Sequence, residues 1–401
     1  MKENIKKILK SFLLITGLLP ILRWWLNRSV RHLKSKLVEL RAENSYYRRE
    51  LSKVPSFEYK SYTAGNTNWS EKWKISQGRR VLFYAYRDYS GSFYKWADAV
   101  NRYTDYAVRL AVFNSHPYQY DYDLILPSNE TGQSGLSDLA AEADLIHIKD
   151  EGGFFNDSNG LPNNFFSKLN SPIIYTAYGG ILRKYSDNKS FRDYVASYQA
   201  RVAMTPDLNY DWFDGYFIPH SIDTELYKYK WNDGNVLAHS PSTKERKGTS
   251  VMEKAIKKTD LEFDLIHGVS HSECMLRKQQ ANFFFDQAGT ESKKKLGIDT
   301  VIGWYGNSAL EAAVFGIPTI AHLSDNSFEG ALRAGKDIKQ KCKIINIGRT
   351  EKEMTEALNN LLEMSAQEKQ ELSKATRKWI ENFHSYNVCA DELSRMYSQL
   401  L

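Results

Sequence analysis

The chain has 401 residues, 42% of them hydrophobic and 25% charged, which is enough for two domains with substantial cores. Its net charge of +6 is uneven, because residues 1–54 hold 13 basic and 4 acidic side chains and the rest of the chain carries a net charge of −3. This distribution argues against a body that grips nucleic acid and favours an N-terminal arm that faces an anionic membrane surface. Three widely spaced cysteines are no disulfide framework and fit a reducing compartment.

Residues 1–26 combine a lysine-rich start with an apolar run that is interrupted by Gly17 and Pro20. The run has about 15 residues, fewer than the roughly 20 that a spanning helix needs. A signal peptide is one alternative, but residues 23–25 (Arg-Trp-Trp) stand where small cleavage-site residues are expected. We therefore expect a membrane-interface segment, which places the protein in the cytoplasm, peripheral on the inner face of the cell membrane.

Residues 27–54 show the apolar spacing of a short coiled coil. Heptad positions a and d are taken by Val30, Leu37, Asn44 and Leu51, and by Leu26, Leu33, Leu40 and Tyr47. Asn44 at an a position favours a two-stranded parallel coil, and hence a homodimer through residues 27–54. A single amphipathic helix is the alternative, because Lys36 and Arg41 would repel each other in the dimer. Residues 55–78 lack a pattern and are interpreted as a linker.

Regular alternation of short apolar strands and helices begins at residue 80. In the first half the sequence predicts strands at 81–85, 107–113, 145–148, 173–176 and 201–204, and helices at 94–101, 136–142 and 191–198. In the second half it predicts strands at 235–239, 263–267, 283–286 and 319–322, and helices at 250–257, 270–280, 308–315, 351–364 and 366–400.

This alternation is typical of parallel sheets that are covered by helices on both faces. We expect an α/β protein with two doubly wound Rossmann-like domains, at residues 79–222 and 223–365, and C-terminal helices at 366–401. The carboxyl ends of the strands in the two domains would then border a ligand cleft.

Residues 301–322 contain a glycine loop that enters a short apolar helix and then a buried strand. Ser308 is a suitable N-cap, and Glu311 three residues later has the spacing of a capping box. A loop that enters a helix in this way also suits a phosphate group. The sequence leaves open whether Glu311 only caps the helix or contacts a ligand.

Three segments together resemble family 4 glycosyltransferases of the GT-B fold. Residues 218–227 (Ile-Pro-His-Ser-Ile-Asp-Thr-Glu-Leu-Tyr) resemble the signature between the two domains, and residues 240–249, with Lys247-Gly248, resemble the donor-domain loop. Residues 306–318 resemble the segment Gly-x-x-x-x-Glu-Ala-x-x-x-Gly-x-Pro. The three occur in the order and at the spacing of the family. The resemblance covers residues 79–400.

The resemblance implies a site for a nucleotide-sugar donor. Lys247 would neutralise the diphosphate, the backbone at Gly306, Asn307 and Ser308 would hold phosphate oxygens, and Glu311 would bind the ribose. Lys247 and Glu311 are thus the candidate catalytic residues, with no cofactor and no metal required.

Two positions depart from the family pattern. Gly303 stands where a second glutamate often contacts the donor sugar, and Ser242 stands in place of a basic residue of the donor site. We expect Trp304 and Tyr305 to contact the sugar by stacking instead.

In the first domain, Gly91 and Ser92 occupy the glycine loop that approaches donor and acceptor in this family. Residues 145–149 resemble a strand end with two histidines, although Lys149 replaces the second one. His147 is therefore a cleft candidate, with a core position as the alternative. Asp150 and Arg183 are candidates for acceptor contacts.

The sequence thus predicts a glycosyltransferase that acts in the synthesis of surface polysaccharide or glycoconjugate. It would move a sugar from a nucleotide-sugar donor to a glycan or lipid-linked acceptor, with retention of configuration implied by the family. The alternatives are a sugar-nucleotide epimerase of the same fold and a dimeric scaffold whose site has decayed. Nucleic acid is not expected as a partner.

Overall fold

The structure is a computed structural model that describes residues 67–149, 165, 169–177, 179–288 and 302–401. These belong to one compact unit of the chain, Lys60–Leu401. The membrane-interface segment, the coiled coil and Asp150 lie outside the described residues. Within the described part, no helix is both long and apolar enough to cross a membrane.

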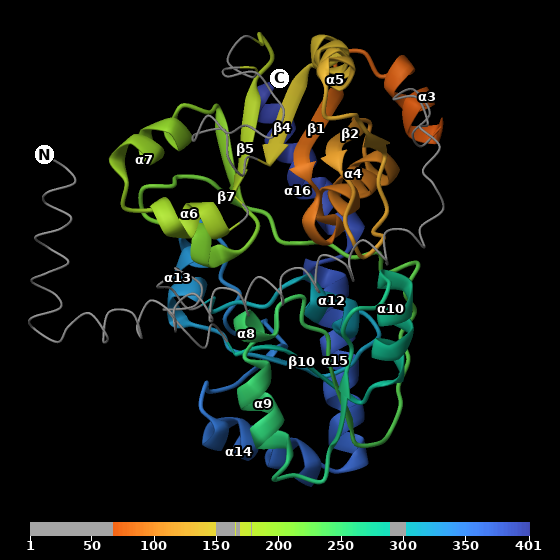
Figure 1. Cartoon of the computed structure of the whole chain (residues 1–401), viewed down its shortest axis with the longest axis vertical. Coiled ribbons are helices and arrows are strands. Elements are labelled where there is room, and N and C mark those ends of the chain that lie inside the picture. Colours follow the sequence, from red (N-terminus) through yellow and green to blue (C-terminus); the bar gives the residue numbers. More distant parts are fainter. Residues whose placement is uncertain (1–66, 150–164, 166–168, 178, 289–301) are drawn as a thin grey trace, which may run out of the picture. The chain divides into compact units, whose positions relative to one another are not determined.

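The first domain is built on a seven-stranded parallel sheet with the order β3-β2-β1-β4-β5-β6-β7 (Figure 1). Its strands are β1 (Arg80–Arg87), β2 (Ala107–Asn114), β3 (Leu124–Ile125), β4 (Leu145–Lys149), β5 (Ile173–Ala177), β6 (Ala200–Ala203) and β7 (Tyr216–Phe217). The order reverses between β1 and β4, so the loops after these two strands border the switch point where ligands of such sheets bind.

Helices α3 (Thr67–Ile75), α4 (Ser92–Tyr103), α5 (Glu130–Glu142), α6 (Gly180–Tyr185) and α7 (Lys189–Ala196) belong to this domain. Helix α3 shows that residues 67–75, part of the linker expected at residues 55–78, are helical. Trp69 and Trp73 are buried in the domain core, and the indole N–H of Trp73 donates to Glu142 at 2.7 Å. The helix is held by these tertiary contacts rather than by an amphipathic repeat.

The second domain has a five-stranded parallel sheet with the order β12-β11-β10-β8-β9. Its strands are β8 (Val236–His239), β9 (Glu262–Leu265), β10 (Phe283–Gln287), β11 (Thr319–Ala321) and β12 (Ile345–Asn346). Its helices are α8 (Lys244–Lys247), α9 (Thr249–Ile256), α10 (His271–Gln280), α12 (Asn307–Ala313), α13 (Asp325–Arg333) and α14 (Glu351–Glu363). The switch point lies between β8 and β10, and both are followed by loops at the same edge.

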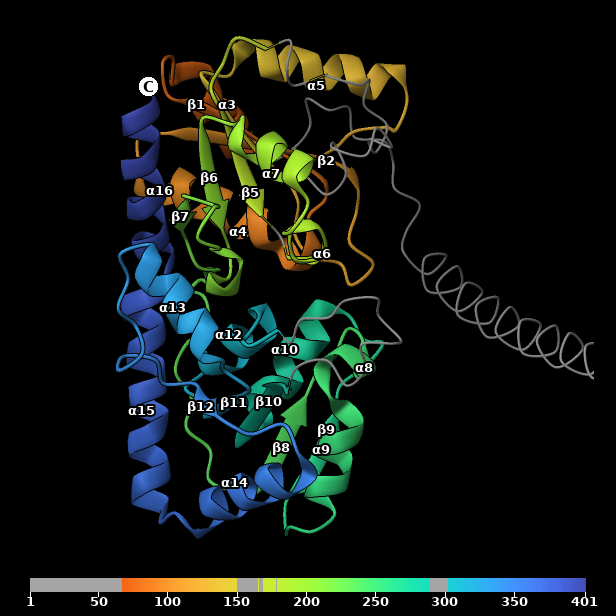
Figure 2. The ribbon, with the colours of Figure 1, turned by 90° about the vertical axis from the view of Figure 1, so that its left-hand side faces the viewer.

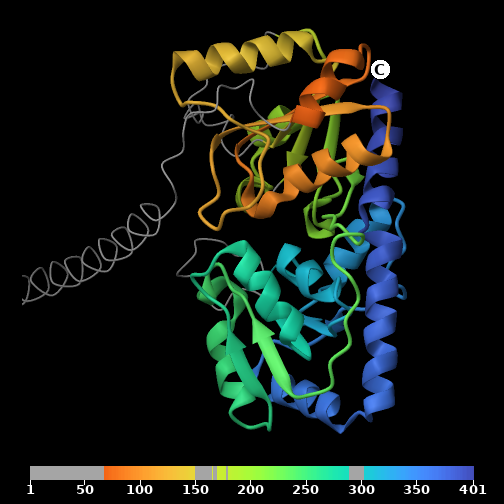
Figure 3. The same ribbon diagram turned by 90° about the vertical axis from the view of Figure 1, so that its right-hand side faces the viewer.

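The single helix expected at residues 366–400 is two helices, α15 (Ala366–Phe383) and α16 (Tyr386–Leu400). They part at His384, whose Nδ1–H donates to the His220 carbonyl at 2.6 Å and whose Nε2 lies 2.9 Å from the Tyr305 hydroxyl. Helix α15 lies beside the second domain and α16 beside the first, where it packs on α4 (Figures 2 and 3). The break therefore depends on tertiary contacts, and no glycine or proline in the sequence marks it.

The predicted doubly wound α/β fold is confirmed: every strand predicted in the sequence is present, and every ladder is parallel. Besides α3, the elements that the sequence did not reveal are short or polar: β3, β7 and β12 have two residues each, and α6, α8 and α13 lie in segments where no helix was predicted.

Candidate functional site

A pocket of about 470 Å³ lies between the loops of the two domains. Its lining includes every residue that the sequence assigned to nucleotide-sugar binding, namely Ser242, Lys247, Gly306, Asn307, Ser308 and Glu311. Ser242 and Lys247 follow β8, and the other four residues lie in α12 or directly before it. The strands of this sheet are parallel, so the loops that carry these residues meet at its carboxyl edge. From the first domain, Arg87, Tyr89 and Ser90 line the opposite wall after β1.

Helix α12 begins differently from the capping box that the sequence suggested. Its N-cap is Gly306, with extended backbone and no side-chain cap, so Ser308 is already the second helical residue. The Ser308 hydroxyl instead contacts the Ser240 hydroxyl at 2.6 Å and the Lys278 ammonium at 3.0 Å. The capping interpretation of Glu311 is therefore wrong.

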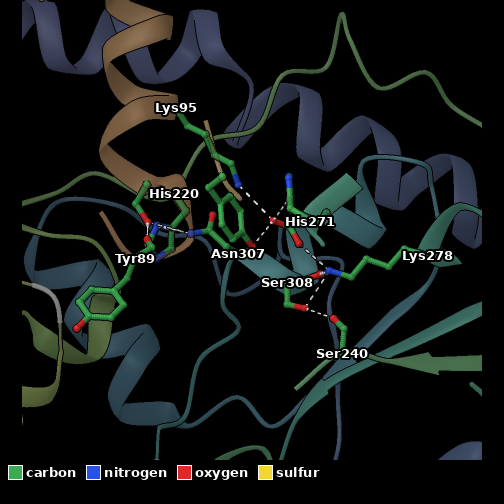
Figure 4. A network of polar contacts seen from close by, with 11 residues as sticks. Tyr89, Lys95, His220, Ser240, His271, Lys278, Asn307 and Ser308 are labelled. Carbon is green, nitrogen blue, oxygen red and sulfur yellow. Dashed lines mark hydrogen bonds and ion pairs between the residues drawn. The ribbon is translucent and has the colours of Figure 1, made fainter. Parts of the chain in front are cut away.

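Glu311 is the centre of a buried ionic network. Its Oε2 accepts from the Lys278 ammonium at 2.6 Å, and its Oε1 lies 3.1 Å from His271 Nε2 and 3.4 Å from the Lys95 ammonium. The Tyr120 hydroxyl also donates to Oε1 at 3.3 Å. Lys95 comes from α4 of the first domain, so the carboxylate joins the two domains. Figure 4 shows the Lys95, His271 and Lys278 side chains pointing toward one another.

Electrostatics keep this network charged. Burial by itself raises the pKa of Glu311, but Lys278, then Lys95 and His271, outweigh it and hold that pKa well below its ordinary value. Burial likewise opposes the charge of Lys278, yet Glu311 turns the balance and raises the pKa of this lysine. The pair is therefore ionised at neutral pH, although the two side chains are only 0% and 3% exposed.

Sequence reasoning missed Lys278 and Lys95. A signal for Lys278 was present, because His271, Cys274 and Lys278 recur at helical spacing on α10 and all three line the pocket. Lys95 carries no such signal, since only the contact between domains brings α4 to Glu311.

Lys247 is paired with a carboxylate that the sequence analysis did not single out. Asp286, near the end of β10, accepts from the Lys247 ammonium at 2.7 Å and from the Gly306 backbone N–H at 2.8 Å. Both are groups that the resemblance assigned to phosphate. The Asp286 side chain is fully buried and that of Lys247 is 18% exposed, so Lys247 still faces the pocket. An ammonium has three donors and can keep this partner while it binds another anion.

Position 303 holds a glycine for a steric reason. A Cβ added there would lie 2.1 Å from Ser324 Oγ, and the Gly303 carbonyl accepts from the Ser324 N–H and the Ser327 hydroxyl. No glutamate fits this backbone. Trp304 and Tyr305 are each 2% exposed in the second-domain core, so the expectation that they stack on a sugar is wrong.

The glycine loop after β1 is a tight turn that opens α4. Ser90 and Gly91 have φ of 58° and 60°, a conformation that glycine adopts readily. The Asp88 carboxylate accepts from the N–H groups of Phe93 and Tyr94, so it caps the helix. Gly91 and Ser92 are buried and do not line the pocket, and the Ser92 hydroxyl accepts from the Asn307 amide at 3.0 Å.

Two of the first-domain candidates lie away from the pocket. His147 is fully buried between Tyr397 and Thr176, and burial lowers its pKa to about 3, so the core alternative holds and the cleft assignment is corrected. Arg183 pairs with Asp207 at 2.6 Å and does not line the pocket. The structure therefore does not support its acceptor role.

Asn307 and His220 form a neutral polar corner of the pocket. Burial lowers the pKa of His220 to about 3. The Asn307 amide nitrogen lies 3.0 Å from Ser92 Oγ and 3.4 Å from His220 Nδ1, whereas its carbonyl Oδ1 is buried without a partner in the described structure (Figure 4). An unmet buried acceptor costs free energy unless a ligand supplies a donor such as a hydroxyl.

No protein-family model and no curated protein sequence matches the chain. Its structure is similar to that of Anabaena HepE in complex with UDP-glucose, with a TM-score of 0.57 and 11% identity over 80% of this chain and 100% of that one. It is also similar to an alpha-glucosyltransferase in complex with UDP-glucose and DNA, with a TM-score of 0.55 and 12% identity over 79% and 98%. The trehalose-6-phosphate phosphatase N-terminal domain of Candida albicans gives a TM-score of 0.52 and 10% identity over 82% and 98%. These likenesses show the fold, which is the two-domain GT-B arrangement.

Proposed function

We propose that the protein is a glycosyltransferase that binds a nucleotide-sugar in the pocket between its two domains. The observation that carries the proposal is the meeting of Lys247, Asn307 and Glu311 in one pocket at the carboxyl edge of the second sheet. Solved structures of this fold with UDP-glucose bound support it.

The diphosphate would bind near Lys247 and the exposed Arg246, which both line the pocket. Transfer of a glycosyl group leaves negative charge on the departing diphosphate, and fixed positive charges stabilise that charge without a metal. Helix α12 has only seven residues and its N-cap N–H is held by Asp286, so the basic side chains rather than the helix terminus would hold the diphosphate.

Glu311 would contact the ribose only by exchanging one of its present partners. Its longest contacts are those to Lys95 at 3.4 Å and Tyr120 at 3.3 Å, and both partners come from the first domain. A ribose hydroxyl that replaces one of them would couple nucleotide binding to the contact between the domains. The Asn307 carbonyl is then free to accept from a sugar hydroxyl.

The remaining parts of the proposal come from the sequence. The acceptor is a glycan or a lipid-linked glycan, transfer occurs with retention, and the product belongs to surface polysaccharide or glycoconjugate. The basic, apolar segment at residues 1–26 would place the enzyme on the inner membrane face, and residues 27–54 would pair two copies.

The test is binding and turnover with UDP-, GDP-, ADP- and dTDP-sugars. Lys247→Ala is expected to weaken nucleotide binding about tenfold or more, because it removes a charge-assisted contact. Lys244→Ala, on the same helix but outside the pocket lining, is the matched control and should bind as the unaltered protein does. Equal binding by both variants would refute the assigned site. Binding without turnover would favour a scaffold whose site has decayed. A nucleotide-sugar product whose sugar is inverted at one carbon would favour an epimerase.

A further inference from the structure

Arg87 is a cation that lines the pocket and is not among the residues assigned to the nucleotide-sugar. It is the last residue of β1, pairs with Asn114 in the β1–β2 ladder and lines the first-domain wall. The lysines in and beside the pocket have carboxylate partners: Lys247 has Asp286, Lys278 and Lys95 share Glu311, and Lys149 has Asp88. Within the described residues Arg87 makes no ion pair, and its Nε is buried without a hydrogen-bond partner.

Among the described residues, the surroundings of Arg87 carry more positive than negative charge. The Arg87 guanidinium carbon lies 5.8 Å from the Tyr89 ring centroid, and the Lys149 ammonium lies 5.3 Å from the same ring. Asp88 is the neighbouring anion, but it already accepts two backbone N–H groups of α4. Burial, followed by the charges of Arg87 and Lys149, lowers the pKa of His116 to about 4, so this ring is neutral and adds no charge.

A half-buried guanidinium with an unmet donor is costly unless an anion completes it. Its planar fork matches a carboxylate or phosphate, which can accept two parallel hydrogen bonds. The exposed Arg246 is different, because water satisfies its donors. Arg87 therefore has the features of a preformed anion contact.

We propose that Arg87 binds an anionic group, a carboxylate or a phosphate, that is carried by one of the two sugars of the reaction. The inference rests on the proposed function and adds a substrate class to it. The anion belongs either to the donor sugar or to the acceptor. In both cases the group lies against the first-domain wall, whereas the donor diphosphate lies against Lys247 of the second domain.

The test compares ligands that differ only in an anionic group, by calorimetric titration of the full-length protein. For the donor, UDP-glucose is compared with UDP-glucuronic acid. For the acceptor, glucose is compared with glucose 6-phosphate in protein saturated with UDP. We expect the anionic member of one pair to bind about tenfold more tightly than its neutral partner.

Arg87→Gln is expected to reduce this preference to about one, and Arg87→Lys to retain part of it, because a lysine keeps the charge but loses the fork. Arg79→Gln is the matched control, since Arg79 precedes the same strand at its other end and pairs on the surface with Asp105. It should keep the full preference. Thermal melting of each variant reports separately on folding.

Three results would overturn the inference. One is the absence of an anion preference in both pairs. Another is a loss of UDP affinity in Arg87→Gln that equals the loss in Lys247→Ala, because Arg87 would then belong to the diphosphate site. The third is a failure of every nucleotide to bind, which rejects the proposed function as well, whereas in the first two results nucleotide binding survives and only the role of Arg87 falls.

Discussion

The ion pair between Glu311 and Lys278 predicts an unequal response to removal of its two partners. Lys278 is fully buried, and apart from Glu311 its ammonium contacts only the carbonyl and hydroxyl of Ser308 among the described oxygens. Glu311→Ala thus leaves a buried ammonium without a carboxylate. Removal of one partner of a buried pair costs about 3–5 kcal/mol, and we expect a loss of unfolding free energy in this range.

Lys278→Met should cost less, below about 3 kcal/mol, since the remaining charge keeps other partners. Glu311 would still contact the Lys95 ammonium and His271, and methionine fills much of the lysine's volume. The free energy of unfolding is measured by urea denaturation at neutral pH, with the slope compared between variants to check that the unfolding transition is unchanged. Lys339→Met breaks an exposed pair with Asp325 and serves as a control that should not change stability measurably.

Destabilisation by Lys278→Met that equals or exceeds that by Glu311→Ala would refute this prediction. That result would mean that Lys95 and His271 do not share the charge of Glu311, and hence that the contact between the domains is looser in solution. It would also remove the basis for coupling ribose binding to that contact.

Two further predictions concern charge and pH. Asp286→Asn should tighten UDP binding about fivefold, because the substitution removes a buried negative charge that repels the diphosphate. Weaker binding would instead show that Asp286 serves to position the Lys247 ammonium, which it now holds. Burial lowers to about 3 the pKa of three histidines, which are His147, His220 and His384. These rings stay neutral in the folded protein but take up a proton below about pH 6.5 in the unfolded protein. The free energy of unfolding is therefore highest above that pH and decreases as the pH falls. Between pH 7 and 5.5, each histidine lowers the free energy of unfolding by about 1.2 kcal/mol, and the three together lower it by about 3–4 kcal/mol. Urea denaturation at both pH values checks this, and unchanged stability would contradict the burial of these rings.

The strands and the site loops were predictable because local pattern and sheet geometry decide them. A run such as residues 283–286 (Phe-Phe-Phe-Asp) is apolar enough to be a central parallel strand in any context. Once the strands are parallel, the loops at 240–249 and 306–308 must meet at one edge, and the pocket indeed includes both.

The errors arise where packing between distant segments overrides local pattern. Residues 67–75 form a helix because Trp69 and Trp73 find a core, and His384 ends a helix because Tyr305 and His220 bind its ring. Gly303 was taken for a missing donor contact, whereas Ser324 leaves no room for any side chain there.

The sequence by itself determined the two parallel sheets, the edge at which a ligand binds and the second-domain residues that reach it, because each depends on short-range pattern and on the common direction of the strands. Only the tertiary structure decided which charges meet there. Lys95 lies 216 positions from Glu311 and Asp286 lies 39 positions from Lys247, and no local rule relates such residues. That Arg87 Nε has no hydrogen-bond partner among the described residues is likewise a property of the fold, because it depends on how distant segments pack around it.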